Sequence, residues 1–413
     1  MQHFLRHPNV ESCAKLVSQY ATTAGIPDLS ESEMEELVDL LLVEASRPGI
    51  SLPEQEPWLI LLKVVLRATF PSASLQQSHT LLLLAASGNH HSPSLPALAA
   101  LTNMVVNNPC LHLPLAERLL PYLGEVFTAI FPLPCDGEGG KKAQTEPTAA
   151  VIALCTARML IHCATSLYLH CAEKEKKNEK DPCVLFRSND IAICNGLYRT
   201  FSSLASPSTR DARRECWRAL YAWYSLGCVC DDDDDDDDDD EDKELLLCHQ
   251  WPSQQLARLT PLMLTLPSDD LGEALCSWTL LQGKVKNKEQ EFHWLDEEIG
   301  LSLGRKAMSL LTPQEMEDVR PVALLQTLCY CSEVCETLRS DLWQLCQSTA
   351  WHSVLSTHLL AQSPWHPQII LAWQRLLWIA CGENSDLLIE TFSWPSMAGL
   401  LVNNGVFHVG GDA

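Results

Sequence analysis

The sequence lacks the signals that mark secreted and membrane proteins. Its first residues, MQHFLRHPNVESCAKL, contain no apolar core of a secretory signal. The longest uninterrupted apolar run is Ala149–Cys155, far below the roughly eighteen residues that indicate a membrane span. We therefore expect an intracellular protein, located in the cytoplasm or the nucleus.

Strand and catalytic signals are also missing. No stretch alternates apolar and polar residues as a strand does, and no Asn-Gly turn joins two apolar runs. Nothing resembles a nucleophile elbow, a phosphate-binding loop or an HExxH helix. The sequence predicts a helical protein that is not an enzyme, with no catalytic residues and no cofactor.

The composition is that of a folded but acidic chain. Of 413 residues, 46% are hydrophobic and 20% are charged, which is enough to bury a core and excludes global disorder. The formal net charge is −24, and the run Asp231–Asp242 supplies 12 of these negative charges, leaving −12 on the remainder. Such a protein is not expected to bind nucleic acid or anionic membranes through its average field.

The 18 cysteines are scattered through apolar helical segments instead of being concentrated in a short loop-rich framework. This distribution favours reduced thiols that pack as small core residues. Cys329, Cys331, Cys335 and Cys346 are close in sequence, but on a helix Cys329 lies away from the face shared by the next two. Core packing is the better interpretation for these four.

A second group, Cys228, Cys230, Cys248 and His249, flanks the acidic run. Its spacing matches no standard zinc motif. We predict no metal site, and leave open whether this group binds one.

Apolar residues recur with helical spacing along most of the chain. In the segment Leu95–Asn108, Leu98, Leu101 and Val105 form one stripe, Pro96 suits a helix start, and the terminal asparagines suit an end. The predicted helices are His7–Tyr20, 30–47, 57–70, 74–87, 95–108, 113–131 with a break at Pro121, 148–177, 191–204, 210–226, 251–266, 269–281, 296–311, 312–334, 336–360, 366–382 and 385–401.

Short helices joined by Pro, Gly and Asn in a chain of this length favour an α-solenoid. Similar buried helices with a polar end recur in both halves, the closest about 50 residues apart, near armadillo and HEAT repeat lengths. We predict an all-α, armadillo/HEAT-like α-solenoid interrupted by a disordered poly-acidic loop. Its parts are N-terminal repeats over residues 1–230, the loop over 231–244, C-terminal repeats over 245–405 and a flexible tail over 406–413.

The motif ALTN at Ala100–Asn103 resembles the inner-helix signature of armadillo repeats. In that family the asparagine holds the backbone of an extended peptide, so the resemblance implies a partner-binding role for Asn103. The tryptophan usual four residues earlier is Ala99 here. The asparagine is not maintained in the other repeats.

The order of elements from Asn9 to about Thr165 resembles the PUL domain of phospholipase A2-activating protein. LSESEMEELVDLL is the most specific piece, and the likeness covers under half of the chain. It implies a non-enzymatic adaptor of a valosin-containing AAA ATPase in ubiquitin-dependent protein turnover, with a basic groove that holds an acidic-aromatic tail. The alternative is a solenoid exchange factor or chaperone of a GTPase.

The best candidate for a binding surface is the segment RDARRECWRAL, where Arg213, Arg214 and Arg218 cluster with Trp217. Such residues pair with acidic groups and stack on rings. Arg158 and Arg375 each stand alone among apolar residues, and we expect them to line a concave face. The acidic run is either a solvated linker or a functional segment that attracts a basic partner or covers the protein's own basic patch.

Overall fold

The computed structural model describes residues 2–6, 8–20, 29–67, 73–86, 94–130, 146–172, 182–204, 206–230, 251–287, 295–311, 321–346 and 367–382. Every regular element in these ranges is helical, so the predicted all-α class is confirmed. Contacts divide the chain into two units, Met1–Asp236 and Asp237–Ala413. The acidic loop, the predicted helix 385–401 and the tail lie outside the described residues.

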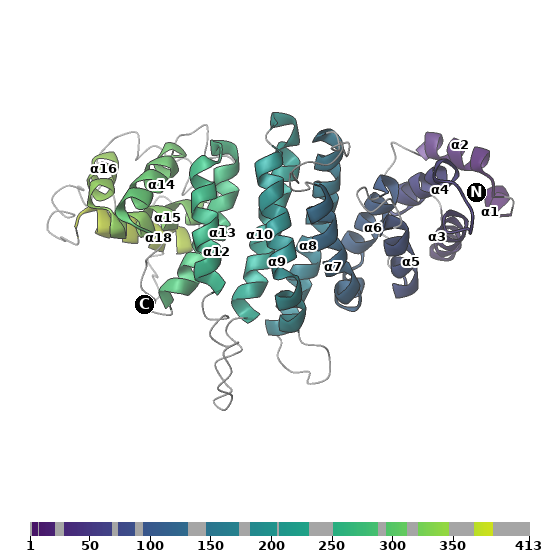
Figure 1. Ribbon diagram of the computed structural model, residues 1–413, viewed down its shortest axis with the longest axis horizontal. Helices are drawn as coiled ribbons and strands as arrows, with labels where there is room; N and C mark the ends of the chain where they lie inside the picture. Colours follow the sequence, from purple (N-terminus) through teal and green to yellow (C-terminus); the bar gives the residue numbers. More distant parts are fainter. Residues whose placement is uncertain are drawn as a thin grey trace, which may run out of the picture. The chain divides into compact units, whose positions relative to one another are not determined.

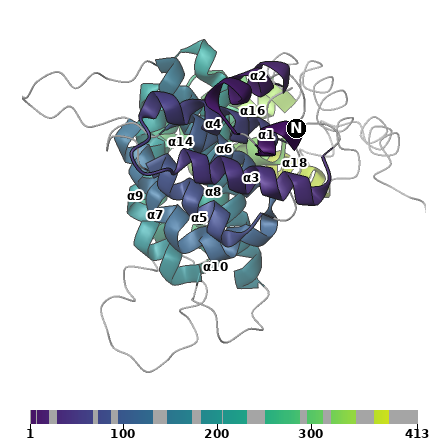
Figure 2. The same ribbon diagram turned by 90° about the vertical axis from the view of Figure 1, so that its right-hand side faces the viewer.

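The described helices of unit 1 are arranged in approximate chain order along the unit (Figures 1 and 2). They are α1 (Gln2–Arg6), α2 (Val10–Tyr20), α3 (Glu31–Ala45), α4 (Leu52–Val65), α5 (Leu75–Ala86), α6 (Leu95–Asn107), η1 (Pro109–Leu111), α7 (His112–Ile130), α8 (Glu146–Ala172), α9 (Pro182–Ser203), η2 (Pro207–Thr209) and α10 (Arg210–Cys230).

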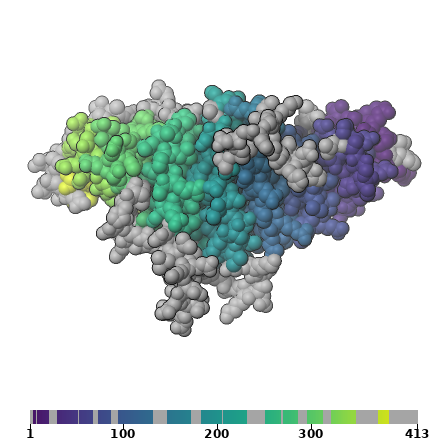
Figure 3. Space-filling view, viewed as in Figure 1, coloured from purple at the N-terminus to yellow at the C-terminus, as the bar shows by residue number. Residues whose placement is uncertain are grey.

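The helices of unit 1 pack in two layers. In one layer, α2, α4, α6, α8 and α10 contact one another in succession, and in the other layer α1, α3, α5, α7 and α9 contact one another in succession. Pairs such as α3 with α4 and α7 with α8 join the layers, and side chains fill the spaces between neighbouring ribbons (Figure 3). This arrangement is compatible with a helical solenoid.

Unit 2 repeats the same scheme on a smaller scale. Its described helices are α12 (Trp251–Thr265), α13 (Ser268–Asn287), α14 (Glu297–Ser309), α15 (Pro321–Val334), α16 (Glu336–Cys346) and α18 (Pro367–Ala380). One layer contains α12, α14 and α16, and the other contains α13, α15 and α18.

Local capping signals fix two helix starts. Ser30 and Glu33 form the predicted reciprocal box at α3: the Ser30 amide donates to Glu33 Oε2 at 3.0 Å, and the Glu33 amide donates to Ser30 Oγ at 3.4 Å. A second box, Ser51 with Glu54, starts α4 at Leu52. The predicted start at Pro57 is therefore wrong, because the helix begins five residues earlier, at Leu52, directly after the Ser51 cap.

Two other predicted boundaries differ from the structure. Helix α7 runs unbroken through Pro121, which lies on the exposed face of the helix. Helix α9 begins at Pro182 instead of Ile191, since proline is well tolerated in the first turn.

Helix C-termini in unit 1 are capped by side chains from a later helix. Gln55 Nε2, on α4, donates to the last carbonyl of α3, Ala45, at 2.8 Å. Asn107 Nδ2, on α6, donates to Leu66 O at the end of α4 at 3.1 Å. These bonds satisfy carbonyls that have no partner within their own helix.

In unit 2 a lysine performs the same role. The Lys306 ammonium, on α14, donates to Met263 O at 3.0 Å, to Leu264 O at 2.9 Å and to Leu266 O, all at the end of α12. Burial lowers the pKa of Lys306. A cation at a helix C-terminus also interacts favourably with the helix dipole.

The long helix α8 is apolar enough, by length and composition, to cross a membrane. The search for uninterrupted apolar runs in the sequence does not find it, because polar residues interrupt the helix. More than half of its most apolar window is buried in this fold, where it packs against α6, α7, α9 and α10. That burial is typical of a core helix in a soluble protein.

Helices α7 and α9 approach each other closely at Gly196. A Cβ atom there would overlap the Phe127 Cβ and lie 3.3 Å from the Phe127 backbone carbon. Gly196→Ala should therefore lower the thermal midpoint, with a cost of about 1–3 kcal/mol. The matched control is Gly283→Ala, because the nearest atom to a new Cβ there is Tyr330 Oη at 3.8 Å. A midpoint in Gly196→Ala at or above that of the wild type would contradict the close approach.

His112 ties α6 to α8. Its Nε2 lies 2.8 Å from Val105 O, and its Nδ1 lies 2.7 Å from Ser166 Oγ. A carbonyl only accepts, so Nε2 carries the proton and Nδ1 accepts from the hydroxyl in the neutral ring. Burial lowers the pKa of His112, and burial and the charge of His112 lower the pKa of His162, whose ring centroid is 5.6 Å away.

These depressed pKa values predict a loss of stability on acidification. Near and below about pH 6.5 the unfolded chain binds protons that the folded rings do not, so the unfolding free energy falls as the pH drops. Melting curves from about pH 7.5 to about pH 5.5 should show this decrease, and His112→Gln should reduce its slope. An unchanged slope in the variant would show that His112 does not contribute.

Candidate functional site

Two of the residues predicted to bind a partner are buried in the core of unit 1. Trp217 is fully buried and stacks on Phe201, with ring centroids 3.7 Å apart and 4° between the planes. Arg213 is also buried. The prediction of a basic-aromatic surface is corrected here for both, because the helical period of α10 turns them inward.

The buried Arg213 guanidinium caps the end of α9. Its Nη1 donates to Leu204 O at 3.0 Å, to Ser206 O at 2.7 Å and to Thr209 Oγ1 at 3.0 Å. This is the role that Lys306 has in unit 2.

The different roles of Arg213 and Arg218 predict different effects on stability. Arg213→Ala leaves buried carbonyls without this donor and should cost roughly 1–3 kcal/mol in denaturant unfolding. Arg218→Ala removes an exposed ion pair and should cost about 0–1 kcal/mol. Equal small effects would show that Arg213 is not a significant cap.

Asn103 is half-buried on α6, and its Nδ2 donates to Lys63 O near the end of α4 at 3.2 Å. It therefore continues the row of Asn107, which donates to Leu66 O. The armadillo resemblance implies that this amide holds a peptide. In this structure its amide nitrogen holds the neighbouring helix.

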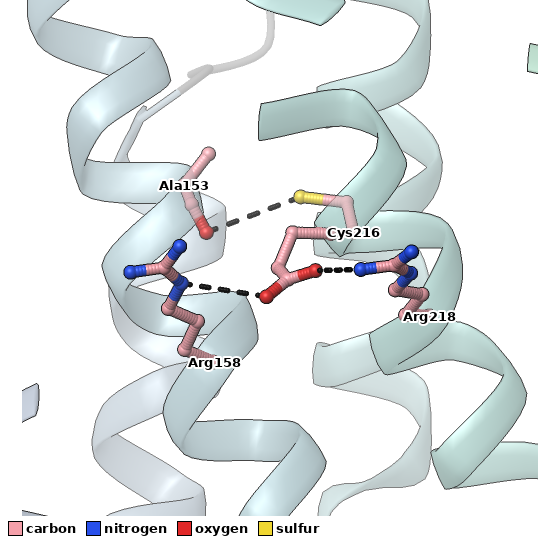
Figure 4. Close-up of polar contacts among 5 residues, drawn as sticks. Ala153, Arg158, Cys216 and Arg218 are labelled. Atoms are coloured by element: carbon pink, nitrogen blue, oxygen red, sulfur yellow. Dashed lines mark hydrogen bonds and ion pairs between the residues drawn. The ribbon is translucent and has the colours of Figure 1, made fainter. Parts of the chain in front are cut away.

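Helices α8 and α10 bring two arginines to one carboxylate (Figure 4). Arg158 Nε lies 3.3 Å from Glu215 Oε1, and Arg218 Nη1 lies 3.2 Å from Glu215 Oε2. The side chains of Arg158 and Arg218 are 52% and 42% exposed, whereas that of Glu215 is 17% exposed. The carboxylate thus lies between two guanidinium groups that reach solvent.

Residues of α8 and of the earlier helices α4 and α6 lie around this group of two arginines and one carboxylate. Burial raises the pKa of the Cys155 thiol on α8, and a hydrogen bond with Thr102 on α6 and the positive charges of Arg158 and Lys63 oppose that shift. Lys63, which is half-buried on α4, thus acts electrostatically on the same thiol as Arg158. We call the surface formed by Lys63, Cys155, Arg158, Glu215 and Arg218 the α4–α10 face.

The remaining predicted arginines lie elsewhere. Arg214 is half-exposed on α10. Arg375, in unit 2, is 44% exposed, pairs with Glu333, and places its guanidinium carbon 5.7 Å from the centroid of the Tyr330 ring. This cation–π contact and ion pair fix Arg375 against α15.

The structure describes all of the first group of cysteines named in the sequence analysis and part of the second. Cys329, Cys331, Cys335 and Cys346 are all buried, as core packing requires. In the group near the acidic run, Cys228 and Cys230 are buried, while 248 and 249 lie outside the described residues.

The sequence reasoning missed Glu215, which joins the two arginines. Its position three residues before Arg218 is a usable signal, because residues i and i+3 are neighbours on a helix. Its contact with Arg158 has no such signal, since 57 residues separate them.

A scan of the sequence against protein-family models found no matching family, and a search of curated proteins found no match.

Proposed function

We propose that this protein is a non-enzymatic interaction scaffold, an armadillo-like solenoid that binds an acidic segment of a partner protein on the α4–α10 face. The observation that supports this proposal is the placement of Arg158 and Arg218 on either side of Glu215, with both guanidinium groups partly exposed. Arginine presents a planar set of donors that matches carboxylates.

An incoming carboxylate can compete with Glu215 for these arginines. Both guanidinium groups reach solvent, so water screens their ion pairs with the less exposed Glu215. These weak ion pairs hold the two arginines in place while leaving part of each guanidinium group accessible to a ligand. Lys63 adds positive charge to the same face, so several acidic residues in one segment are favoured over a single carboxylate.

The proposed partner follows from the PUL resemblance of the first half of the chain. That resemblance implies an adaptor of a valosin-containing AAA ATPase in ubiquitin-dependent protein turnover, bound through an acidic-aromatic tail. The three cations of the α4–α10 face, Lys63, Arg158 and Arg218, against its one carboxylate, Glu215, support this choice of an acidic tail. A GTPase is the alternative partner.

The binding test uses a fluorescent peptide that alternates acidic and aromatic residues, with anisotropy as the readout. Arg158→Glu and Arg218→Glu should each weaken binding about tenfold or more, since each removes a charge-assisted contact. The matched control is Arg305→Glu, because Arg305 is 56% exposed and pairs with Asp341 at 3.0 Å in unit 2. Equal weakening in all three variants would indicate nonspecific attraction and contradict the proposal.

Glu215→Gln should have the opposite effect. Removing the internal carboxylate releases both guanidinium groups for the ligand, so affinity should rise, and salt should weaken binding in the wild type and the variant. Reduced affinity in Glu215→Gln would mean that Glu215 positions the arginines or contacts the ligand itself.

Deleting Asp231–Asp242 separates the two interpretations of the acidic run. Tighter peptide binding after deletion indicates that the run covers the α4–α10 face, and unchanged binding indicates a linker.

Capture from cell extract with wild type and Arg158→Glu then identifies the partner: an AAA ATPase lost in the variant supports the adaptor, and a GTPase supports the alternative.

A further inference from the structure

Three buried cysteines converge at one end of three consecutive helices. Cys171 lies in the last turn of α8, Cys183 in the first turn of α9, and Cys230 is the last residue of α10. All three are buried, and their Sγ atoms lie within 4.8 Å of one another. In the part of the chain that the structure describes, this is the one group of three potential metal ligands.

The cluster differs from two other buried cysteines of the same helices. Cys163 Sγ on α8 and Cys216 Sγ on α10 each lie 3.9 Å from a backbone carbonyl of a neighbouring helix, that of His112 and that of Ala153. Those thiols pack singly. In the cluster, by contrast, the three Sγ atoms lie within 4.8 Å of one another.

We propose that Cys171, Cys183 and Cys230 form a binding site for a thiophilic metal ion, with zinc(II) as the ion that fits best. Zinc–sulfur bonds of about 2.3 Å place ligand sulfurs about 3.8 Å apart in a tetrahedral site. The observed limit of 4.8 Å is within reach of that spacing by small rotations of the side chains. Thiolates are the ligands that zinc(II) and copper(I) prefer.

Charge favours zinc(II) over copper(I). Binding releases one proton from each of the three thiols, so zinc(II) leaves a net charge of −1 in the buried site, and copper(I) leaves −2. The larger buried charge is more costly. The C-termini of α8 and α10 carry the negative ends of their helix dipoles, which also favours the ion of higher charge, while the N-terminus of α9 stabilises the Cys183 thiolate.

A bound ion would join the ends of α8, α9 and α10. Two of these helices, α8 and α10, carry the arginines of the α4–α10 face. The site would therefore stabilise the register between α8 and α10 without taking part in the contact with a partner. It is independent of the proposed function.

The test measures zinc binding by the full-length, reduced, metal-free protein against a chelating indicator. Wild type should bind one zinc per chain through these thiols, and Cys230→Ser should lose it. The matched control is Cys216→Ser, a buried thiol on the same helix, which should retain it. Zinc should raise the melting temperature of wild type and Cys216→Ser but not of Cys230→Ser. Zinc retained by Cys230→Ser would assign the ion to other ligands and overturn the proposal.

A measurement on the unaltered chain covers the case in which a variant does not fold. Cobalt(II) substituted for zinc should give sulfur-to-cobalt charge-transfer absorption with the intensity of three thiolates, and metal binding should release three protons. Absence of this absorption, or copper(I) binding with no zinc binding, would overturn the zinc assignment.

Discussion

The structure depends on satisfying the backbone carbonyls at helix C-termini. A layered array of helices contains many such ends, and each leaves carbonyls with no partner in its own helix. Here side chains from a later helix supply the donors: Gln55 for α3, Asn103 for α4, His112 for α6, Arg213 for α9 and Lys306 for α12. Each of these bonds fixes one helix against another, so the same contacts that satisfy the backbone also set the packing.

This constraint explains why polar residues that suggest binding in the sequence are structural in the fold. Asn103 and Arg213 have the chemistry to hold a peptide backbone or a carboxylate, and they use it on neighbouring helix ends. Arg158 and Arg218, by contrast, keep their guanidinium groups partly exposed and share Glu215. Their exposure, rather than their residue type, makes the α4–α10 face the candidate site.

The cysteines show the same distinction between composition and placement. Most of the described thiols are buried, which agrees with their expected use as small core residues. Cys171, Cys183 and Cys230 differ because they contact one another. No sequence pattern indicates this cluster, because the three cysteines are far apart in the chain. In the sequence, Cys230 is close only to Cys228.

Local interactions determined the features that the sequence alone could predict. Helical periodicity gave the all-α class, and the Ser30–Glu33 box fixed the start of α3, because both depend on residues within one or two turns. Tertiary packing decided the rest. The burial of Trp217, the Arg158–Glu215 pair and the meeting of the three thiols depend on contacts between helices. Only the register between packed helices brings such distant residues together, and a single sequence does not encode that register in any local pattern.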